Sequence, residues 1–234
     1  MESLLNLLRG PVLLLSFAVF FLGVARPLVL AAVELVRAYR KAGDPVVPWG
    51  FLFRKSLGWI FPVNAMRGTR TFYTLASLVF HVGMLAVPLF LAGHVALIQK
   101  GVGIAWPALP ASVADVLTLA ALAALLFLVL ARLLDRASRT LSDVQDWGLL
   151  ALCIAAFLSG FAVAHPQANP LPFTLTYAAH LLSAELLLLL VPFSKLAHAA
   201  LFPLTRITWE MGWHFVPGAG ERVRIALGKE GEPV

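Results

Sequence analysis

The sequence has little charge. Only 13% of its 234 residues are Asp, Glu, Lys or Arg, whereas 60% are apolar. A water-soluble domain is usually about half apolar and about a quarter charged. The shortage of charge therefore excludes a compact water-soluble enzyme, and the excess of apolar residues excludes a disordered chain. Lipid is the solvent that fits this composition.

Cysteine is also scarce. Cys153 is the only cysteine in the sequence and lies in an apolar run, so a disulfide framework and a cysteine-ligated metal cluster are both excluded. Neither an HExxH nor a CxxC motif occurs, so the metal sites of hydrolases are not indicated. Any chemistry must therefore come from other side chains.

Long apolar runs are abundant, and five of them are long enough to cross a bilayer core of about 30 Å, which needs roughly 20 helical residues. They cover Leu4–Ala25, Tyr73–Ile98, Val116–Leu134, Trp147–Ala164 and Thr174–Ala199. We therefore expect an all-α integral membrane protein, a five-transmembrane-helix bundle. The first run is interpreted as a retained span and not as a secretory signal. Its leading segment holds Glu2 and only one basic residue, Arg9, and a helical pattern continues through Leu28–Arg40.

The basic residues are unevenly distributed among the connections. Fifteen of the 18 lie at the end of the third or fifth run or after the first, third or fifth, whereas Arg9 and Lys100 lie on the opposite side and Arg26 lies near the end of the first run. Because Lys and Arg gather on the cytoplasmic side, we expect the N-terminus outside and the C-terminus in the cytoplasm. The formal net charge of +6 is then mainly a signal of topology, and no nucleic-acid partner is expected. A basic face for an acidic partner or anionic lipid is a second interpretation.

Two connecting segments differ from the spans in composition. Pro45–Arg70 mixes proline and aromatic residues with basic ones, so we expect it to lie along the cytoplasmic interface. Gln99–Ala114 contains Trp106 and two prolines, which favours an ordered cap at the outer membrane surface.

Histidine is the polar residue that stands out within the spans. Four of the six histidines lie there: His81, His94, His180 and His198. Ionisable residues in the hydrocarbon region are costly and usually functional. Isolated histidines, each hydrogen-bonded to a neighbouring helix, are the alternative interpretation. Two histidines on each of two spans favour a shared role.

The spacing of these histidines suggests two levels in the membrane. His180 and His198 are 18 residues apart, which is five turns of an ideal helix and about 27 Å of rise, so both would share one face. His81 and His94 are about 20 Å apart along the axis but roughly 140° apart in azimuth, and Pro88 between them favours a kink. Because the two spans run in opposite directions, His94 should pair with His180 on the outer side and His81 with His198 on the inner side. Paired imidazoles are suitable axial ligands for haem iron.

A few other polar residues are candidates for supporting roles. Glu185 could relay protons or could be protonated against a neighbouring helix. Arg26, Arg67 and Arg70 could pair with haem propionates, or they could simply extend to the interface. His165 and His214 are interpreted as loop and tail residues, although His165 could help a quinol proton to leave.

Two stretches carry a resemblance to a known family. FHVGMLAVPLFLAGH (Phe80–His94) and HLLSAELLLLLVPFSKLAH (His180–His198) resemble the respiratory nitrate reductase gamma subunit superfamily of dihaem cytochromes b. The segment GIAWPALPASVADVLTL and the SAE triplet are similar to the membrane subunits of sulfate-reducer redox complexes, of the DsrM, HmeC and TmcC type. Nitrate reductase relatives have a lysine where this sequence has Ala114–Asp115, and a shorter histidine interval in the second span. Both departures favour the sulfate-reducer branch.

The resemblance implies specific cofactors and partners. It makes His81, His94, His180 and His198 the axial ligands of two b haems and places a menaquinol site near the outer haem, around His94 and the following loop. It also implies a cytoplasmic iron–sulfur partner, and often a periplasmic multihaem cytochrome c. Residues 1–215 would be the dihaem membrane domain and residues 216–234 a cytoplasmic tail, in the inner membrane of a prokaryotic cell.

The sequence thus favours a membrane dihaem cytochrome b subunit of a respiratory redox complex. Such a subunit would exchange electrons between the menaquinone pool and its partners, and would belong to a quinol-oxidising or quinone-reducing enzyme. The alternatives are a non-redox transporter whose histidines line a cavity and an anchor subunit that holds a partner complex at the membrane.

Overall fold

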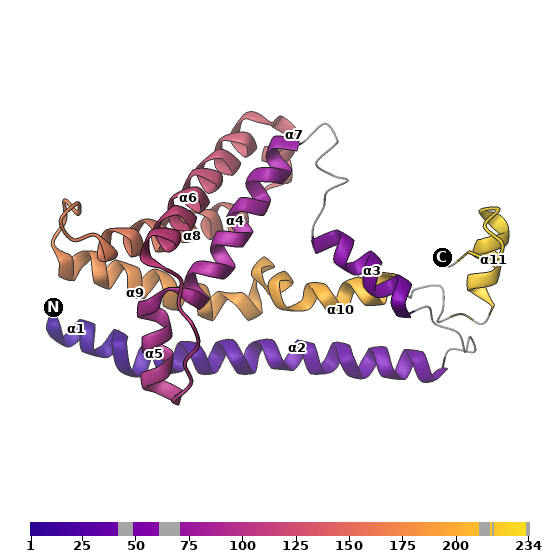
Figure 1. Ribbon diagram of the computed structural model, residues 1–234, viewed down its shortest axis with the longest axis horizontal. Helices are drawn as coiled ribbons and strands as arrows, with labels where there is room; N and C mark the ends of the chain where they lie inside the picture. The colour runs from indigo at the N-terminus through magenta and orange to yellow at the C-terminus, as the bar shows by residue number, and fades with distance from the viewer. Residues whose placement is uncertain (42–48, 61–70, 211–215, 217, 233–234) are drawn as a thin grey trace. The chain divides into compact units, whose positions relative to one another are not determined.

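The computed structural model describes residues 1–41, 49–60, 71–210, 216 and 218–232, and these residues contain helices and connections but no strand. Figure 1 shows the order of the helices along the chain. The helices are α1 (Glu2–Leu7), α2 (Leu13–Lys41), α3 (Trp49–Ile60), α4 (Thr71–Phe90), α5 (Ala92–Val102), α6 (Ala111–Leu134), α7 (Arg136–Leu141), α8 (Val144–Ala164), α9 (Phe173–Leu190), α10 (His198–Glu210) and α11 (Ala219–Ala226).

Five helical segments of the described chain are long and apolar enough to cross a membrane, which confirms the number of spans expected. They cover Glu2–Arg37, Thr71–Phe90, Ala111–Leu134, Val144–Ala164 and Phe173–Phe193. Many large apolar side chains on them are exposed, including Leu22 at 73% and Phe21 at 62%. Such surfaces are unfavourable in water but are suited to contact with lipid. These helices identify the chain as a multi-pass membrane protein. Which side of the membrane each terminus faces remains a prediction.

The second and fifth spans are shorter than the sequence suggested. The helix expected over Tyr73–Ile98 ends at Phe90, and Leu91 has extended backbone (φ −66°, ψ 132°) before α5 begins. The helix expected over Thr174–Ala199 ends at Leu190, and two 3₁₀ turns separate it from α10. Pro88 and Pro192 lie next to these breaks, since a proline removes a backbone donor from the helix ladder. The ideal-helix argument that placed His198 on the same face as His180 is therefore wrong.

By spatial clustering the chain forms two compact units. The first unit contains Met1–Ser16 and Asn64–Leu188, and the second contains Phe17–Val63 and Leu189–Val234. We describe each unit by itself. In the second unit α3 packs against α10, and Gly23 of α2 approaches Pro192 so closely that a Cβ at residue 23 would lie 2.7 Å from the proline ring.

Helices α4, α6 and α8 form the centre of the first unit. Val87, Ala121 and Phe157 are buried together, one from each helix. Gly83 lets α4 approach α6 closely, because a Cβ at this position would lie 2.6 Å from the Cβ of Ala121 and 3.0 Å from the carbonyl oxygen of Leu117. Helix association in lipid depends on such small residues, which bring two backbones together.

The N-terminal helix packs against α9 in the same unit. Leu5 and Leu8 are buried with Ala178 and Leu181, and the guanidinium of Arg9 lies 4.6 Å from the centre of the Tyr177 ring. A π-helical turn over Leu8–Val12, which contains Pro11, joins α1 to α2. The helix that was expected to continue through residues 28–40 does so, because α2 extends to Lys41.

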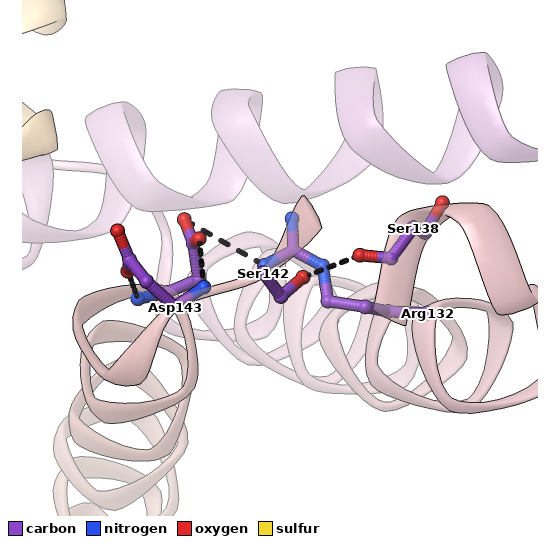
Figure 2. A network of polar contacts seen from close by, with 5 residues as sticks. Arg132, Ser138, Ser142 and Asp143 are labelled. Atoms are coloured by element: carbon purple, nitrogen blue, oxygen red, sulfur yellow. Dashed lines mark hydrogen bonds and ion pairs between the residues drawn. The ribbon is translucent and has the colours of Figure 1, made fainter. Parts of the chain in front are cut away.

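A polar corner joins α6 to α8 through the short helix α7. Asp143 caps α8 in a reciprocal box with Asp146: each carboxylate accepts a hydrogen bond from the other residue's backbone N–H, at 3.0 Å. The Arg132 guanidinium lies 3.8 Å from the Asp146 carboxylate, and Figure 2 shows Arg132 beside Asp143 at this corner. The hydroxyl of Ser142 donates to the carbonyl of Ser138 at 2.7 Å. The corner satisfies the backbone donors at the start of α8, so the two spans are joined by a defined turn.

Replacement of Gly83 by alanine tests the close approach of α4 and α6. We expect Gly83→Ala to lower the free energy of unfolding by about 1–3 kcal/mol, the usual effect of overpacking. Gly148→Ala is the matched control, because a Cβ at that position meets nothing within 4 Å. Denaturation of both variants in detergent measures the difference. Equal stability of the two variants would contradict the packing described.

Candidate functional site

The imidazole rings of His94 and His180 lie next to one another in the first unit, with nearly parallel planes. Their centroids are 6.0 Å apart and their planes differ by 6°. His94 comes from α5, two residues after its start, and His180 comes from the middle of α9. The structure therefore brings together the outer pair that the sequence predicted.

The position of His94 depends on the end of α4. The last carbonyl groups of a helix have no partner within the helix. Here the Pro88 carbonyl accepts a hydrogen bond from Nδ1 of His94 at 3.1 Å. The break at Leu91 makes this bond possible, since it turns α5 so that the imidazole lies back against the end of α4.

The next two carbonyl groups of α4 are satisfied by the following loop. The Leu89 carbonyl accepts from Nε1 of Trp106 at 2.8 Å, and the Phe90 carbonyl accepts from the backbone N–H of Leu109 at 2.8 Å. The segment expected as a cap, Gln99–Ala114, thus has an ordered middle part between the end of α5 at Val102 and the start of α6 at Ala111, and its position at the outer surface stays a prediction. Three successive terminal carbonyls thus bind one imidazole and two loop donors, which fixes α5 and the loop to the end of α4.

His180 lies against α8. Its Nδ1 donates to the Ala156 carbonyl at 3.1 Å, with the hydroxyl of Ser159 at 3.5 Å from the same nitrogen. Gly160 leaves room for the ring, because a Cβ there would lie 2.9 Å from Cε1 of His180. Helix α8 thus provides both an acceptor and a flat surface for this imidazole.

These contacts determine which nitrogen of each ring has the lone pair. A carbonyl oxygen only accepts, so Nδ1 has the proton in both His94 and His180. In the neutral ring Nε2 is then the nitrogen that can bind a metal. Burial lowers the pKa of His94, against the opposing effect of its hydrogen bonds to backbone carbonyls, and so favours the neutral form. Histidines that bind metals are commonly oriented by such bonds from the second nitrogen.

A centroid separation of 6.0 Å is the one that a metal ion between two imidazoles requires when both Nε2 atoms point at it. A transition metal lies about 2 Å from an imidazole nitrogen, and the ring centre lies roughly 1 Å behind that nitrogen, which gives a centroid separation of about 6 Å. Among the described residues no group of three His, Cys, Asp or Glu side chains gathers as for a non-haem ion. A haem iron needs only two protein ligands, because the macrocycle supplies the others.

The two histidines of the predicted inner pair belong to different units. His81, on α4, bonds through Nδ1 to the Ser77 carbonyl at 2.6 Å, and His198, at the start of α10, bonds in the same way to the Lys195 carbonyl at 2.6 Å. In all four predicted ligands, Nδ1 is therefore hydrogen-bonded to a backbone carbonyl, either of the preceding turn or of a neighbouring element. The pairing of His81 with His198 remains a prediction.

Glu185 is 2% exposed, and neither of its carboxylate oxygens has a hydrogen-bond partner among the described residues. Leu181 follows Ala178 by three residues, and Glu185 follows Leu181 by four. Glu185 is therefore on the same face of α9 as these two residues, which pack against the N-terminal helix. Ser16 extends the facing stripe of Leu5, Leu8 and Val12, and its hydroxyl is also buried without a partner. Two buried polar groups thus lie on facing stripes of the same helix pair.

Comparison with known proteins gives one relative of nearly full length. The chain is 33% identical over 219 residues, 92% of this chain and 96% of the relative, to a protein of Nitratidesulfovibrio vulgaris (strain Hildenborough) whose name, "Protein", specifies no activity. The chain belongs to the family of that protein. No protein-family model matches the chain, and no solved structure matches it.

The remaining predicted residues lie apart from the His94–His180 pair or outside the described chain. Arg26 is exposed on α2, in the second unit, and Arg67 and Arg70 lie outside the described residues, as does His214. His165 is the C-cap residue of α8, at the start of the following loop as expected, and its Nε2 lies 3.3 Å from the carboxylate of Asp115.

Sequence reasoning missed the groups that orient the histidines. These groups are backbone atoms: the Pro88 carbonyl, the Ala156 carbonyl and the surface of Gly160. Most residue types would provide the same carbonyl, so the sequence gave little sign of the two acceptors. Only Pro88, which predicts an interrupted helix, indicated that carbonyl groups would be free to bind a side chain there.

Replacement of Gly160 tests the seat of His180. We expect Gly160→Ala to displace the imidazole, because the added Cβ would lie within 3 Å of the ring. In the full chain with isotope-labelled histidine, the NMR signals of the His180 and His94 rings should shift. Gly148→Ala, which adds the same methyl group to open space on α8, should leave both signals in place. Unchanged signals in Gly160→Ala would contradict the contact.

Proposed function

We propose that this protein is a membrane dihaem cytochrome b subunit of a respiratory redox complex. It would exchange electrons between the menaquinone pool and partner iron–sulfur or cytochrome c subunits. The resemblance of two histidine-containing stretches to the nitrate reductase gamma superfamily, and to the membrane subunits of sulfate-reducer complexes, supports this proposal. The five apolar spans and the paired histidines support it independently.

The observation that carries the proposal is the geometry of His94 and His180. Two parallel imidazoles 6.0 Å apart, each with Nδ1 bonded to a backbone carbonyl, have Nε2 as the remaining nitrogen for a metal. The same separation is also found in ordinary parallel aromatic pairs. What favours ligation is that Nδ1 of both His94 and His180 is bonded to a backbone carbonyl, so that the lone pair of each neutral ring lies on Nε2.

The residues of the chain would divide the work as follows. His94 and His180 would hold the outer haem, and His81 and His198 the inner haem. When bound, two b haems would supply one-electron carriers at two depths of the membrane. The backbone carbonyls would keep each imidazole in one tautomer and orientation, so that the ligands need little rearrangement. Arg26, Arg67 and Arg70 would pair with propionate carboxylates at the inner side.

The charge distribution supports a partner on the cytoplasmic side. Most basic residues follow the first, third and fifth spans, and the positive-inside rule assigns that side to the cytoplasm. An iron–sulfur protein with an acidic face would dock there. The N-terminus and the loop with Trp106 would then face the periplasm, where a cytochrome c partner would bind.

Glu185 would serve as a proton relay within the bundle. A buried carboxyl group without a hydrogen-bond partner is costly in a membrane and is usually retained for function. Ser16 on the facing helix stripe offers a hydroxyl that could share a water molecule with it. The carboxyl group would take up a proton when negative charge is added to the outer site.

The first test is the optical spectrum of the purified protein. We expect a dithionite-reduced minus oxidised difference spectrum of b type, and two haems per chain in a pyridine haemochrome assay. Protein purified with no haem, from cells that supply haem to other cytochromes, would overturn the proposal and would favour a transporter or an anchor subunit.

The ligand assignment is tested by single substitutions. His94→Ala and His180→Ala should each remove one haem, and the same one, because both rings would bind one iron. His81→Ala and His198→Ala should each remove the other. His214→Ala is the control and should keep two haems per chain. Retention of both haems in His94→Ala or His180→Ala would refute the outer pair.

The relay role of Glu185 predicts a change in the pH dependence of one redox potential. In the parent protein the midpoint potential of the outer haem should fall as the pH rises, since reduction is coupled to proton uptake. Glu185→Gln should reduce that slope while both haems remain bound. Glu34→Gln, at an exposed glutamate on α2, should have the parent slope. An unchanged slope in Glu185→Gln would contradict the relay.

A further inference from the structure

Helix α3, in the second unit, has a stripe of large apolar side chains that the rest of the described chain does not cover. Trp49, Phe53 and Leu57 follow one another at intervals of four residues, so they share one face of the helix. They are 53%, 67% and 41% exposed, respectively. Another side of α3 packs against α10 (Figure 1). The stripe is therefore suited to an apolar environment and not to water.

The contact between α3 and the end of α2 indicates where this stripe lies. Exposed apolar side chains continue along α2 as far as Val36, and the basic residues Arg37 and Arg40 follow. Tyr39 therefore lies where the apolar surface of α2 gives way to charge. The centroids of the Tyr39 and Trp49 rings are 6.2 Å apart. Since Tyr and Trp side chains gather at the boundary between membrane and water, this contact places the start of α3 at that boundary.

The charge of this surface is positive. Helix α3 contains Arg54 and Lys55 and no acidic residue, and Asp44 is the only acidic residue between positions 39 and 60. Arg54 is exposed and lies about 60° around the helix from Leu57, at the edge of the apolar stripe. An arginine in such a position can keep its stem on an apolar surface while its guanidinium reaches the polar headgroups.

Lys55 is placed differently from its neighbour. It is two residues away from both Phe53 and Leu57, so it lies about 160° around the helix from each of them. Its ammonium group is above the ring of Phe51, 5.3 Å from the centroid. Of the two adjacent basic residues, Arg54 thus borders the stripe, whereas Lys55 lies on the opposite side and contacts an aromatic ring.

We propose that α3 is a binding site for anionic phospholipid. The stripe of Trp49, Phe53 and Leu57 packs on the acyl chains, and the guanidinium of Arg54 binds the headgroup phosphate through paired hydrogen bonds. A helix with an apolar face and basic residues binds the membrane surface more tightly when the lipid is anionic.

A lipid fits the stripe better than an acidic protein does. A water-soluble acidic protein could pair with Arg54, but the bilayer is the apolar neighbour already present where α2 ends. This inference needs only the membrane-spanning helices and holds with or without the proposed haems.

The lipid contact is measured by fluorescence quenching, with the full chain in bilayers of phosphatidylcholine and phosphatidylglycerol. One of the two lipids is brominated in each sample, because bromine quenches a tryptophan that it contacts. The sequence has six tryptophans, so the Trp49 signal is taken as the difference between the parent protein and Trp49→Phe. We expect both brominated lipids to quench it, and phosphatidylglycerol to be preferred by about 5-fold, the usual effect of one basic residue near an anionic surface.

Two neighbouring substitutions separate binding by Arg54 from a general effect of charge. Arg54→Gln should remove most of the preference for phosphatidylglycerol, and Arg54→Lys, which keeps the charge, should retain part of it. Lys55→Gln is the matched control: it removes one positive charge from the next residue, on the other side of the helix, and should keep the parent preference.

Each remaining outcome would contradict the proposal. If neither brominated lipid quenches Trp49, the stripe is covered by protein, either an acidic partner or another part of the assembly, and no lipid site exists there. If the two lipids quench the parent equally, the site does not select anionic headgroups. If Arg54→Gln and Lys55→Gln lose the same preference, the attraction is a diffuse effect of net charge and Arg54 binds no phosphate.

Discussion

The constraint on which this structure depends is that lipid offers no hydrogen bonds to the backbone. A helix that ends within or near the hydrocarbon region must find partners for its last carbonyl groups. Helix α4 ends at Phe90, and the carbonyls of Pro88, Leu89 and Phe90 bind the ring of His94, the indole of Trp106 and the backbone of Leu109. The same bonds that satisfy the backbone thus determine the orientation of a candidate ligand and the path of the following loop.

In α8, too, a backbone carbonyl orients a histidine ring. The Ala156 carbonyl lies within a helix and is already part of the backbone ladder, yet it also accepts from His180, since a carbonyl oxygen has two lone pairs. The Ser159 hydroxyl lies beside the same ring nitrogen, and Gly160, which has no side chain, leaves space for the ring. The orientation of the two imidazoles therefore rests largely on backbone atoms, and it is insensitive to most substitutions among the apolar residues nearby.

Much of the fold could be predicted from the sequence, because hydrophobic length is a strong signal. All five spans were located, with ends that agree to within a few residues for the third and fourth. The helices of the second and fifth spans end earlier than predicted. Apolar composition continues across a helix break, so it does not show where the backbone hydrogen bonds of the helix stop. Pro88 and Pro192 indicated where to expect irregularity but not its form: one extended residue in the first case, two 3₁₀ turns in the second.

The candidate site was predicted in part. The pairing of His94 with His180 followed from chain direction and membrane depth, and the structure brings those two rings together. Their hydrogen bonds were not predictable, because every acceptor is a backbone carbonyl and has no residue type of its own. The contact between His165 and Asp115 was missed for a different reason: the two residues are 50 positions apart, one near the start of α6 and the other at the end of α8, and no motif links them.

The single extended residue at Leu91 has a mechanical consequence. Leu91 takes part in both helices, because its N–H donates to the Val87 carbonyl of α4 and its own carbonyl accepts from His94 and Val95 of α5. A change in its ψ angle would therefore change the direction of α5, and with it the position of the His94 ring.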